Sequence, residues 1–576
     1  MIIFLAFSGP DSEKYNITHL VWNLEQIDEV DEVIYMNRKK EKENWIDFID
    51  VGLKKCDIMI GFFIENWSES WVKEEYSSAR SMKRKIIPLF ENRNHLPSLL
   101  SCVEGIDLTN TKFKYLHHNL YFLIKARLNI TDSFLERLSD EECDLIKELE
   151  ESTSRSFLPV KKVNETTPMG IEFEEDNIIG LGLYKANLNF IPNSINCLKN
   201  LRFLSLSYNN LKELPKTIGS LFSLKKLYLN HNCVNKLSDE LTGLSSLREL
   251  LVMNNQLKKL PENIGNIASL TRITFFKNKL VSIPDSIANL QNLTKLGLGH
   301  NQLNKLPDSI CNLKKLNYLW LDNNLLTEIP DQIGNLQSLK LLDLNHNSLN
   351  SLPESMGALS SLEQLYLTYN KLEWVPDTFE NLNSLKKLLL SHNRIQEIPA
   401  SLFHLPSLQD LQLPYNQIES LPESLKNLNL KSLKVLNLSH NNLKKLPSYL
   451  GNLTSLRELY LDNNNLVEIP PSLCNLKSLE YLSLENNNLE TIPKCIDRLP
   501  KLETLIISGN SLGRKYASYN FENRSCMYQV KYLIKNFMQS EEFYDYFAER
   551  YSEYERLVNK YKENQISLTE FVRDCF

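Results

Sequence analysis

Apolar residues recur with a fixed period between Leu181 and Leu512, and this pattern dominates the chain. Each unit reads L-x-L-x-x-N-x-L-x-x-L/I-P, followed by a short apolar segment and a leucine pair that leads into the next unit. Successive units begin 23 residues apart, except that Leu411 and Leu436 are 25 residues apart. A period of this length predicts a solenoid. The first apolar strand residues of the fifteen units are at 181, 204, 227, 250, 273, 296, 319, 342, 365, 388, 411, 436, 459, 482 and 505.

The L-x-L segment predicts a short strand in each unit. Leu227 and Leu229 are two residues apart, so they point to one side of a strand. Strands of successive units are expected to stack as a parallel sheet with a spacing of about 4.8 Å, so that fifteen strands make an arc of roughly 70 Å. The inward leucines find a core only against neighbouring units, so the array needs many units to be stable.

An asparagine follows the first strand residue by five positions in fourteen units. Leucines line this turn, so we expect the asparagine to be buried with hydrogen-bond partners. Its amide offers both donors and an acceptor, which predicts a structural ladder that bonds backbone groups of its own turn and of the next coil. The first unit has Ala186 there and Asn187 one residue later, as is typical of an end unit. The asparagines are at 209, 232, 255, 278, 301, 324, 347, 370, 393, 416, 441, 464, 487 and 510.

Residues 1–130 alternate instead between strand-like and helix-like segments. This alternation predicts an α/β domain with a parallel sheet that helices cover on both faces. Ligands of such sheets bind at the carboxyl ends of the strands. Strands are predicted at 2–8, 32–36, 57–63, 85–90 and 105–108, and helices at 17–27, 45–55, 69–83 and 115–128.

Four segments of this region resemble the TIR (Toll/interleukin-1 receptor) family. They are 4–8 (FLAFS), 54–63 (KKCDIMIGFF), 68–79 (SESWVKEEYSSA) and 85–90 (KIIPLF), and the third is the most specific. The resemblance covers nearly all of residues 1–130 and implies a flavodoxin-like fold. The repeats resemble the leucine-rich-repeat family, so together the two resemblances imply a TIR–leucine-rich-repeat protein of prokaryotic type.

Many TIR domains cleave NAD+ at the nicotinamide–ribose bond and share a glutamate four residues after the tryptophan of the third segment. That glutamate is Glu75 here, four residues after Trp71. On the predicted helix, Glu75 borders the apolar face that holds Val72 and Tyr76, whereas Glu74 points away. Nicotinamide leaves as a neutral ring, and a carboxylate can stabilise the oxocarbenium-like ribose that remains. The resemblance therefore implies an NAD+ nucleosidase with Glu75 as its catalytic residue, NAD+ as its substrate and no resident cofactor.

The phosphates of a dinucleotide need hydrogen-bond donors near the end of the first strand. A glycine in the loop there lets the backbone approach closely, a basic pair stands in the position of the family's BB loop, and two tryptophans can stack on a base or ring. The basic pair can equally be a solvated loop, and Trp71 can equally pack its helix. The candidate substrate-binding residues are Ser8, Gly9, Arg38, Lys39, Trp67 and Trp71.

Two other interpretations stay open for this domain. A TIR domain can act as a non-enzymatic adaptor or scaffold, and the loop after the first strand favours this because it lacks the arginine that many NAD-cleaving members have there. Nucleoside 2-deoxyribosyltransferase-like proteins also combine a strand that ends in a tight turn with a helix glutamate, although the S-x-S-W-V context favours TIR.

Both flanks of the array have helix-like patterns. Residues 131–180 are interpreted as a linker and amino-terminal cap, with a capping box at Ser139-x-x-Glu142 and a Ser-, Thr- and Lys-rich linker candidate at 153–167. The repeats are assigned to 181–513. Residues 514–576, rich in Tyr, Phe, Glu and Lys, are interpreted as a helical carboxyl-terminal cap, with a partner-binding helix as the alternative.

The residue between the two leucines of each strand is expected on the concave face of the sheet. Aromatic residues recur there or just beyond the strand, and exposed aromatics are typical anchors of a binding surface. The predicted partner-binding residues are Phe276, Trp320, Tyr366 and Tyr460. Histidines also recur one residue before the ladder asparagines, but they lie two or more coils apart, roughly 10 Å, which is too far for one metal ion.

Composition sets the remaining limits. A net charge of −6 and a pI of about 6 give no case for nucleic acid or an anionic membrane, and no apolar run reaches the roughly 20 residues of a membrane span. None of the ten cysteines forms C-x-x-C, and several, such as Cys311 and Cys474, are expected to be free and apolar in character. These features favour a cytoplasmic protein. The two family resemblances imply a receptor-like signalling protein whose repeats bind a protein or other ligand and whose TIR domains self-associate.

Overall fold

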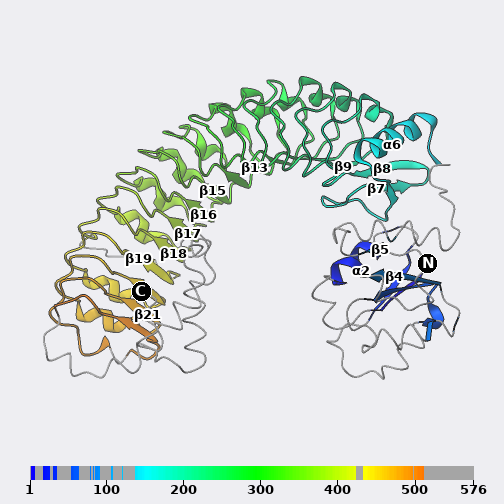
Figure 1. The fold of residues 1–576 in the computed structure, drawn as a ribbon. Helices are drawn as coiled ribbons and strands as arrows, with labels where there is room; N and C mark the ends of the chain where they lie inside the picture. The colour runs from blue at the N-terminus through cyan, green and yellow to red at the C-terminus, as the bar shows by residue number, and fades with distance from the viewer. Residues whose placement is uncertain are drawn as a thin grey trace. The chain divides into compact units, whose positions relative to one another are not determined.

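The computed structural model describes residues 2–6, 17–25, 27, 30–35, 53–63, 78–79, 82, 85–90, 106–107, 120, 137–422, 432–496 and 499–511. The chain divides into two compact units, Met1–Leu293 and Thr294–Phe576. The first unit contains the amino-terminal sheet, a capping segment and the first coils of the array (Figure 1). The predicted carboxyl-terminal cap at 514–576 lies outside the described residues.

The amino-terminal sheet has five parallel strands in the order β2-β1-β3-β4-β5. This order is the flavodoxin-like one, so the predicted fold class is confirmed. The strands and the adjoining helix are β1 (Ile2–Ala6), α2 (Ile17–Glu25), β2 (Glu32–Ile34), β3 (Ile58–Phe63), β4 (Lys85–Phe90) and β5 (Ile106–Asp107).

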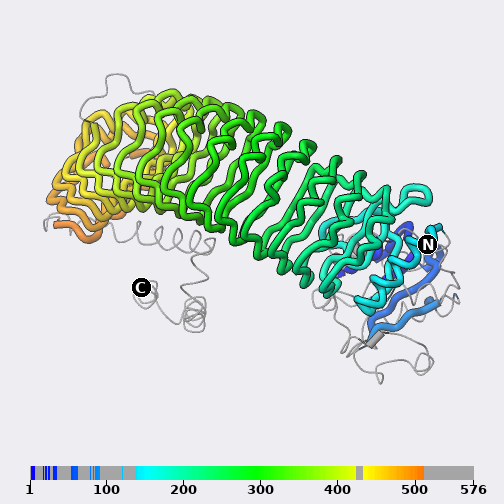
Figure 2. The backbone as a smooth tube through the Cα atoms, turned by 90° about the horizontal axis from the view of Figure 1, so that it is seen from above, coloured from blue at the N-terminus to red at the C-terminus, as the bar shows by residue number. Residues whose placement is uncertain are grey.

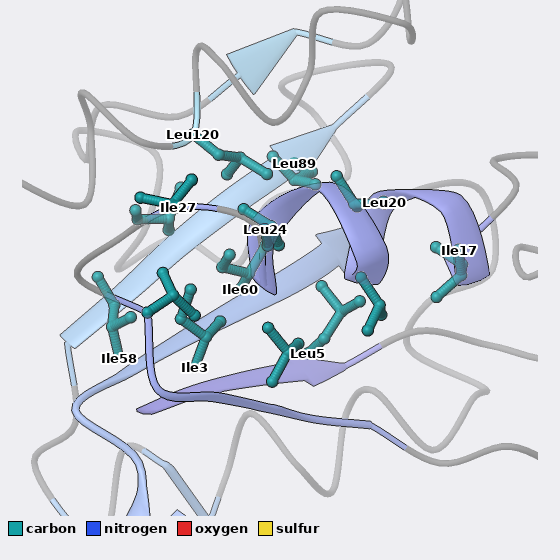
Figure 3. Packing of buried hydrophobic residues seen from close by; sticks show 14 of the residues in the cluster. Ile3, Leu5, Ile17, Leu20, Leu24, Ile27, Ile58, Ile60, Leu89 and Leu120 are labelled. Carbon is teal, nitrogen blue, oxygen red and sulfur yellow. The ribbon is translucent and has the colours of Figure 1, made fainter. Parts of the chain in front are cut away.

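Both faces of this sheet are buried, because consecutive residues of a strand point to opposite sides. On one side, Ile3 and Leu5 of β1 pack with Ile60 of β3 and with Leu20 and Leu24 of α2, and all of these side chains are almost fully buried (Figure 3). On the other side, Phe4, Ala6 and Met59 form a separate cluster with Leu53, Cys56 and Ala79. Near-continuous apolar strands such as IIFLA therefore belong to a sheet covered twice, as the sequence predicted.

Helix α6 (Asp140–Thr153) begins with the predicted capping box. The Ser139 hydroxyl accepts a hydrogen bond from the Glu142 amide, and the Glu142 carboxylate accepts one from the Ser139 amide. Its buried residues Leu145, Ile146 and Leu149 face inwards, and the Ser194 hydroxyl of the first coil donates to Glu148. The helix therefore covers the end of the array.

The segment 153–167, favoured as a linker by its composition, is packed in the structure. It contains β6 (Leu158–Pro159), which pairs with β7 (Gly170–Glu174), and β7 pairs antiparallel with β8 (Asn177–Gly182). Leu158, Val160 and Val163 are buried in the same core cluster as helix α2. A few apolar residues in a polar stretch thus suffice for a capping sheet, and the cap is a helix plus strands rather than a helix alone.

Every one of the fifteen first apolar residues of the repeat lies in a strand, β8 to β22. The short strands pair in parallel with their neighbours in each unit, with leucine aligned to leucine, as in Leu319↔Leu342 and Leu342↔Leu365. The strands of the first unit are β8, β9 (Phe203–Ser205), β10 (Lys226–Tyr228), β11 (Glu249–Leu251) and β12 (Arg272–Thr274). Those of the second unit are β13 (Lys295–Gly297), β14 (Tyr318–Trp320), β15 (Leu341–Asp343), β16 (Gln364–Tyr366), β17 (Lys387–Leu389), β18 (Asp410–Gln412), β19 (Val435–Asn437), β20 (Glu458–Tyr460), β21 (Tyr481–Ser483) and β22 (Thr504–Ile506).

Short 3₁₀ helices return the chain along the back of most coils, and in each unit successive coils lie side by side (Figure 2). Proline precedes most of them, as Pro307 and Pro353 do, because its fixed φ suits the residue that opens such a turn. In the first unit these helices are η6 (Asn193–Cys197), η7 (Lys216–Ser220), η8 (Asp239–Gly243), η9 (Ile264–Asn266) and η10 (Asp285–Asn289). In the second they are η11 (Asp308–Asn312), η12 (Ile333–Asn335), η13 (Glu354–Ala358), η14 (Asp377–Asn381), η15 (Ala400–His404), η16 (Ser448–Asn452) and η17 (Pro471–Asn475).

One cysteine departs from the expectation that these residues are free. Cys474 forms a disulfide with Cys495, at a Cα–Cα distance of 5.7 Å. The two are 21 residues apart, close to one repeat, so stacking of successive coils brings them together. Cys311 is free and buried as predicted, and burial raises the pKa of its thiol to about 11, which keeps it an inert apolar group.

Candidate functional site

The candidate substrate segments follow three strands of the amino-terminal sheet in the chain. The strand order reverses between β1 and β3, which are adjacent and parallel, and ligands of such sheets bind outside the carboxyl ends of the strands at this point. The segments 7–16 and 64–77 follow β1 and β3 in the chain, and 36–52 follows β2. The predicted residues Ser8, Gly9, Arg38, Lys39, Trp67, Trp71 and Glu75 all belong to these segments, which lie outside the described residues.

One helical turn is described just after Glu75. The Met82 amide donates to the Ser78 carbonyl at 3.0 Å, which is the spacing of an α-helix. Ala79 is fully buried, and Met82 packs against the same cluster on the sheet. The apolar face that the sequence assigns to the segment 69–83 is therefore turned towards the sheet at these two residues.

The concave face of the second unit carries Trp320, Asp343 and Tyr366 side by side. They are directly paired in register on β14, β15 and β16, each lying between the two leucines of its strand. In Figure 1 these strands line the inner side of the second unit. All three side chains are partly buried, so the two aromatics predicted as anchors flank a carboxylate rather than form an uninterrupted apolar patch.

A second aromatic residue supports Trp320. Tyr318, two residues earlier on the same strand, stacks on it with ring centroids 5.6 Å apart and planes 10° from parallel. The Lys295 ammonium lies over the Tyr318 ring, 5.3 Å from its centroid. Gly297, the neighbour of Trp320 on β13, contributes no side chain to the face. Trp320 therefore stacks on Tyr318, and the neighbouring strand β13 has no side chain beside it at Gly297.

Asp343 sits in an unfavourable environment for a charge. Its carboxylate accepts a hydrogen bond from the Asn345 amide at 3.0 Å. Burial, and to a lesser degree the neighbouring Asp322 carboxylate, raise the pKa of Asp343 to about 6. Asp322 itself lies 3.6 Å from the His300 ring nitrogen. The concave face here therefore holds two carboxylates close to Trp320.

The other predicted partner-binding aromatics lie apart from this group. Tyr460 on β20 is partly buried, its hydroxyl donates to Glu458, and its ring lies 4.7 Å from that of Tyr481. Phe276 follows β12 in the first unit and is partly buried, with the Lys277 ammonium 5.8 Å from its ring centroid.

Tyr228 and Leu251, expected to be exposed on the same face, are 8 % and 4 % exposed. Tyr228 packs edge-on against Phe203 and donates to Glu249, which explains its burial.

The asparagine ladder has the predicted chemistry, with one change of direction. Asn324, 6 % exposed, accepts the Leu303 amide at 3.0 Å and donates to the carbonyls of Leu298 and Leu321, each at 3.0 Å. Leu298 and Leu303 belong to the preceding coil, whereas the sequence predicted bonds to the next one. The ladder is continuous across the longer repeat as well, because Asn441 accepts the Ile418 amide.

The histidine row is part of a longer aromatic stack that sequence reasoning missed. His346, Tyr369, His392, Tyr415 and His440 stack face to face, with successive ring centroids 4.0 to 4.3 Å apart. Each occupies a left-handed backbone position that opens the turn before the ladder asparagine. The signal was present in the sequence as tyrosines that alternate with the histidines at one-repeat spacing. Within the described residues, no group of three His, Cys, Asp or Glu side chains could hold a metal ion.

Comparison with known families matches one family to the amino-terminal region and another to the repeats. A TIR domain model matches residues 3–118, and a leucine-rich repeat region model matches 155–298 and 304–413. Further leucine-rich-repeat models match 431–475 and 454–512. None of the described helices is long and apolar enough to cross a membrane.

Two solved structures resemble the repeat array. A leucine-rich-repeat protein of Leptospira interrogans is 38 % identical, with a TM-score of 0.52, over 56 % of this chain and 83 % of its own. The leucine-rich-repeat ectodomain of the Arabidopsis thaliana receptor kinase GASSHO1/SCHENGEN3, solved with CASPARIAN STRIP INTEGRITY FACTOR 2, is 31 % identical, with a TM-score of 0.53, over 61 % of this chain and 44 % of its own. No match is found among curated proteins.

Proposed function

Because this chain is a leucine-rich-repeat protein with an amino-terminal TIR domain, we propose that its repeats recognise a partner and its TIR domain then hydrolyses NAD+ on self-association. The domain pair itself identifies a signalling or interaction protein. The observation that carries the enzymatic proposal is the position of Glu75 four residues after Trp71, in a segment that follows β3 at the reversal of strand order.

The described part of the helix supports a role for Glu75. A helix through 69–83, as the sequence predicts, places Glu75 one turn before the fully buried Ala79. A carboxylate at that edge is close to the sheet but still able to reach a ligand at the carboxyl ends of β1 and β3. In the proposed reaction, water replaces nicotinamide at the ribose carbon, and the Glu75 carboxylate stabilises the positive charge that develops as the bond breaks.

Two adjacent glutamates make a matched test of this assignment. The full chain, concentrated to favour self-association, is incubated with NAD+ while nicotinamide release is followed by chromatography. Glu75→Ala should abolish release, whereas Glu74→Ala, which removes the same charge one residue earlier, should retain most of it. Both variants should unfold within about 1 kcal/mol of the wild type, because most substitutions away from the centre of an apolar face cost little.

The adaptor interpretation gives a different result in the same assay. If wild-type protein releases no nicotinamide at any concentration, the TIR domain does not act as an NAD+ nucleosidase under these conditions, and the adaptor role is favoured. The loop after β1, which lacks arginine, is the feature that supports this alternative. Equal release by the wild type and the Glu75 variant would remove Glu75 from the mechanism.

For the repeats, we propose that the concave face of the second unit binds a polypeptide. The GASSHO1/SCHENGEN3 ectodomain, the plant relative above, was solved with a bound integrity factor. In this chain, partly buried aromatic side chains gather at Trp320 and Tyr366, which are typical anchors of a binding surface.

A further inference from the structure

The group formed by Tyr318, Trp320, Asp322, Asp343 and Tyr366, called here the acidic aromatic site, combines two features that recognise cations. Aromatic faces attract a cation placed within about 6 Å of the ring centroid. Carboxylates supply the opposite charge and accept its hydrogen bonds. Register pairing puts Asp343 on the strand directly between Trp320 and Tyr366.

The charge of this site is not neutralised as it is elsewhere on the same face. Asp410, on β18, lies 3.2 Å from the Lys387 ammonium. Among the described residues, no lysine or arginine lies within ion-pair distance of Asp343 or Asp322. The Asp322 carboxylate lies 3.6 Å from the His300 ring nitrogen and accepts a hydrogen bond from the Asn323 side-chain amide at 3.0 Å. Partial burial of a carboxylate without a nearby cation has a free-energy cost, because the charge loses contact with water. A bound cation would offset this cost.

The aromatic residues already hold one cation of the chain itself. Lys295 lies over the Tyr318 ring, which shows that a side-chain cation fits against this stack. Lys295 is on β13, so it lies on the opposite side of Trp320 from Asp343 on β15 and Tyr366 on β16. Trp320 and Tyr366 are two strand spacings apart, roughly 10 Å from backbone to backbone, with Asp343 on the strand between them.

We propose that the acidic aromatic site binds an arginine side chain of a polypeptide partner. This inference rests on the proposed function, because it names the chemistry by which the concave face recognises its partner. Arginine fits better than a compact ammonium, because its planar guanidinium can stack between two rings while its donors reach two carboxylates. A polypeptide fits better than a small metabolite, because the site lies on an open sheet face, along which an extended chain can continue towards Tyr460.

The test uses the full chain labelled with 5-fluorotryptophan and followed by ¹⁹F NMR. The six tryptophans give six signals, and Trp320→Phe identifies the one from Trp320. The probes are the pentapeptide Ac-Gly-Ser-Arg-Ser-Gly-NH₂ and the same peptide with citrulline, which has the shape of arginine without its charge. We expect the arginine peptide to shift the Trp320 signal saturably, and the citrulline peptide to bind at least about tenfold more weakly.

Two variants separate the local effect from general electrostatics. Asp343→Asn should weaken arginine-peptide binding by about fivefold or more. Asp410→Asn removes the same charge from the same face, three strands away, and should leave binding within about twofold because Asp410 already has Lys387 as its partner. The fluorine signals of the other tryptophans report whether each variant is folded.

The outcomes distinguish this inference from the function on which it rests. Equal binding of the arginine and citrulline peptides, or undiminished binding by Asp343→Asn, overturns the arginine site but leaves a concave-face partner in place. No shift of the Trp320 signal with either peptide up to about 10 mM, the range of a weak single-residue contact, also overturns it. Nicotinamide release is measured without any peptide, so the enzymatic proposal stands or fails independently.

Discussion

Replacement of Asn324 by alanine should destabilise the array more than any exposed substitution in the same coil. The side chain is 6 % exposed and bonds backbone groups of two coils at once. Its oxygen accepts the Leu303 amide, and its nitrogen donates to the carbonyls of Leu298, Leu321 and Asp322 at 3.0, 3.0 and 3.2 Å. Alanine removes all four bonds and offers no replacement.

The magnitude follows from the groups left without a partner. A buried donor or acceptor that loses its hydrogen bond costs about 1–3 kcal/mol. The Leu303 amide loses its partner completely, so it contributes about 2 kcal/mol, and the two closest carbonyls, which share one NH₂ group, contribute about 1 kcal/mol each. The total is about 4 kcal/mol. Since 1 kcal/mol shifts the Tm of a domain of 150–250 residues by about 2–4 °C, we expect a decrease of roughly 8–16 °C.

The measurement is thermal and urea unfolding followed by circular dichroism, with Asn304→Ala as the control. Asn304 lies in the preceding coil and is exposed, with no side-chain hydrogen bond recorded within the described residues. Its replacement should change stability by less than about 0.5 kcal/mol. If Asn324→Ala unfolds at the same temperature and urea concentration as Asn304→Ala, the ladder does not stabilise the array and the reasoning is wrong.

Two further predictions concern the second unit. The pKa of Asp343 is raised from 3.8 to about 6 in the folded protein, so its ionisation opposes folding: the cost is absent below about pH 4 and complete above about pH 6. Asp343→Asn should therefore stabilise the protein by about 1–2 kcal/mol at pH 7.5 and by little at pH 4. This magnitude discounts the shift of about 2 pKa units because the side chain is partly exposed. Urea midpoints that give the same stability difference at both pH values would contradict this. Gly334→Ala should destabilise by about 1–3 kcal/mol, because a Cβ atom there would lie 2.0 Å from the Ser355 carbonyl oxygen. Ala288→Gly, at the equivalent place in another coil, is the control, and an unchanged urea midpoint for Gly334→Ala would refute the steric argument.

The sequence by itself determined the structure of each repeat and the register between neighbouring repeats. A 23-residue period fixes which residues of neighbouring units meet, since every unit faces a near-copy of itself. The leucines of the strands and the buried asparagines could therefore be assigned without coordinates. The parallel α/β class of the amino-terminal region also followed, because its strands are apolar on both faces and alternate with helix-like segments.

The tertiary structure decided what composition could not. The segment 153–167 is polar on average, yet Leu158, Val160 and Val163 are buried, because three well-placed apolar residues are enough when a neighbouring core accepts them. The pairing of Cys474 with Cys495 also required the coil geometry, since many residues are separated by nearly one period but few have Cα atoms 5.7 Å apart.

The candidate binding site on the concave face was also predicted only in part from the sequence. Periodicity placed Trp320 and Tyr366 in one column two coils apart, and it put Asp343 between them. It gave no measure of how deeply that carboxylate is buried, or of which acidic residues have a cation nearby. Those properties depend on the side chains of three adjacent coils together, such as Lys387 beside Asp410 and none beside Asp343 among the described residues. Local pattern sets the position of a residue on a repeat, whereas its electrostatic environment is a sum over neighbours that only the folded array brings together.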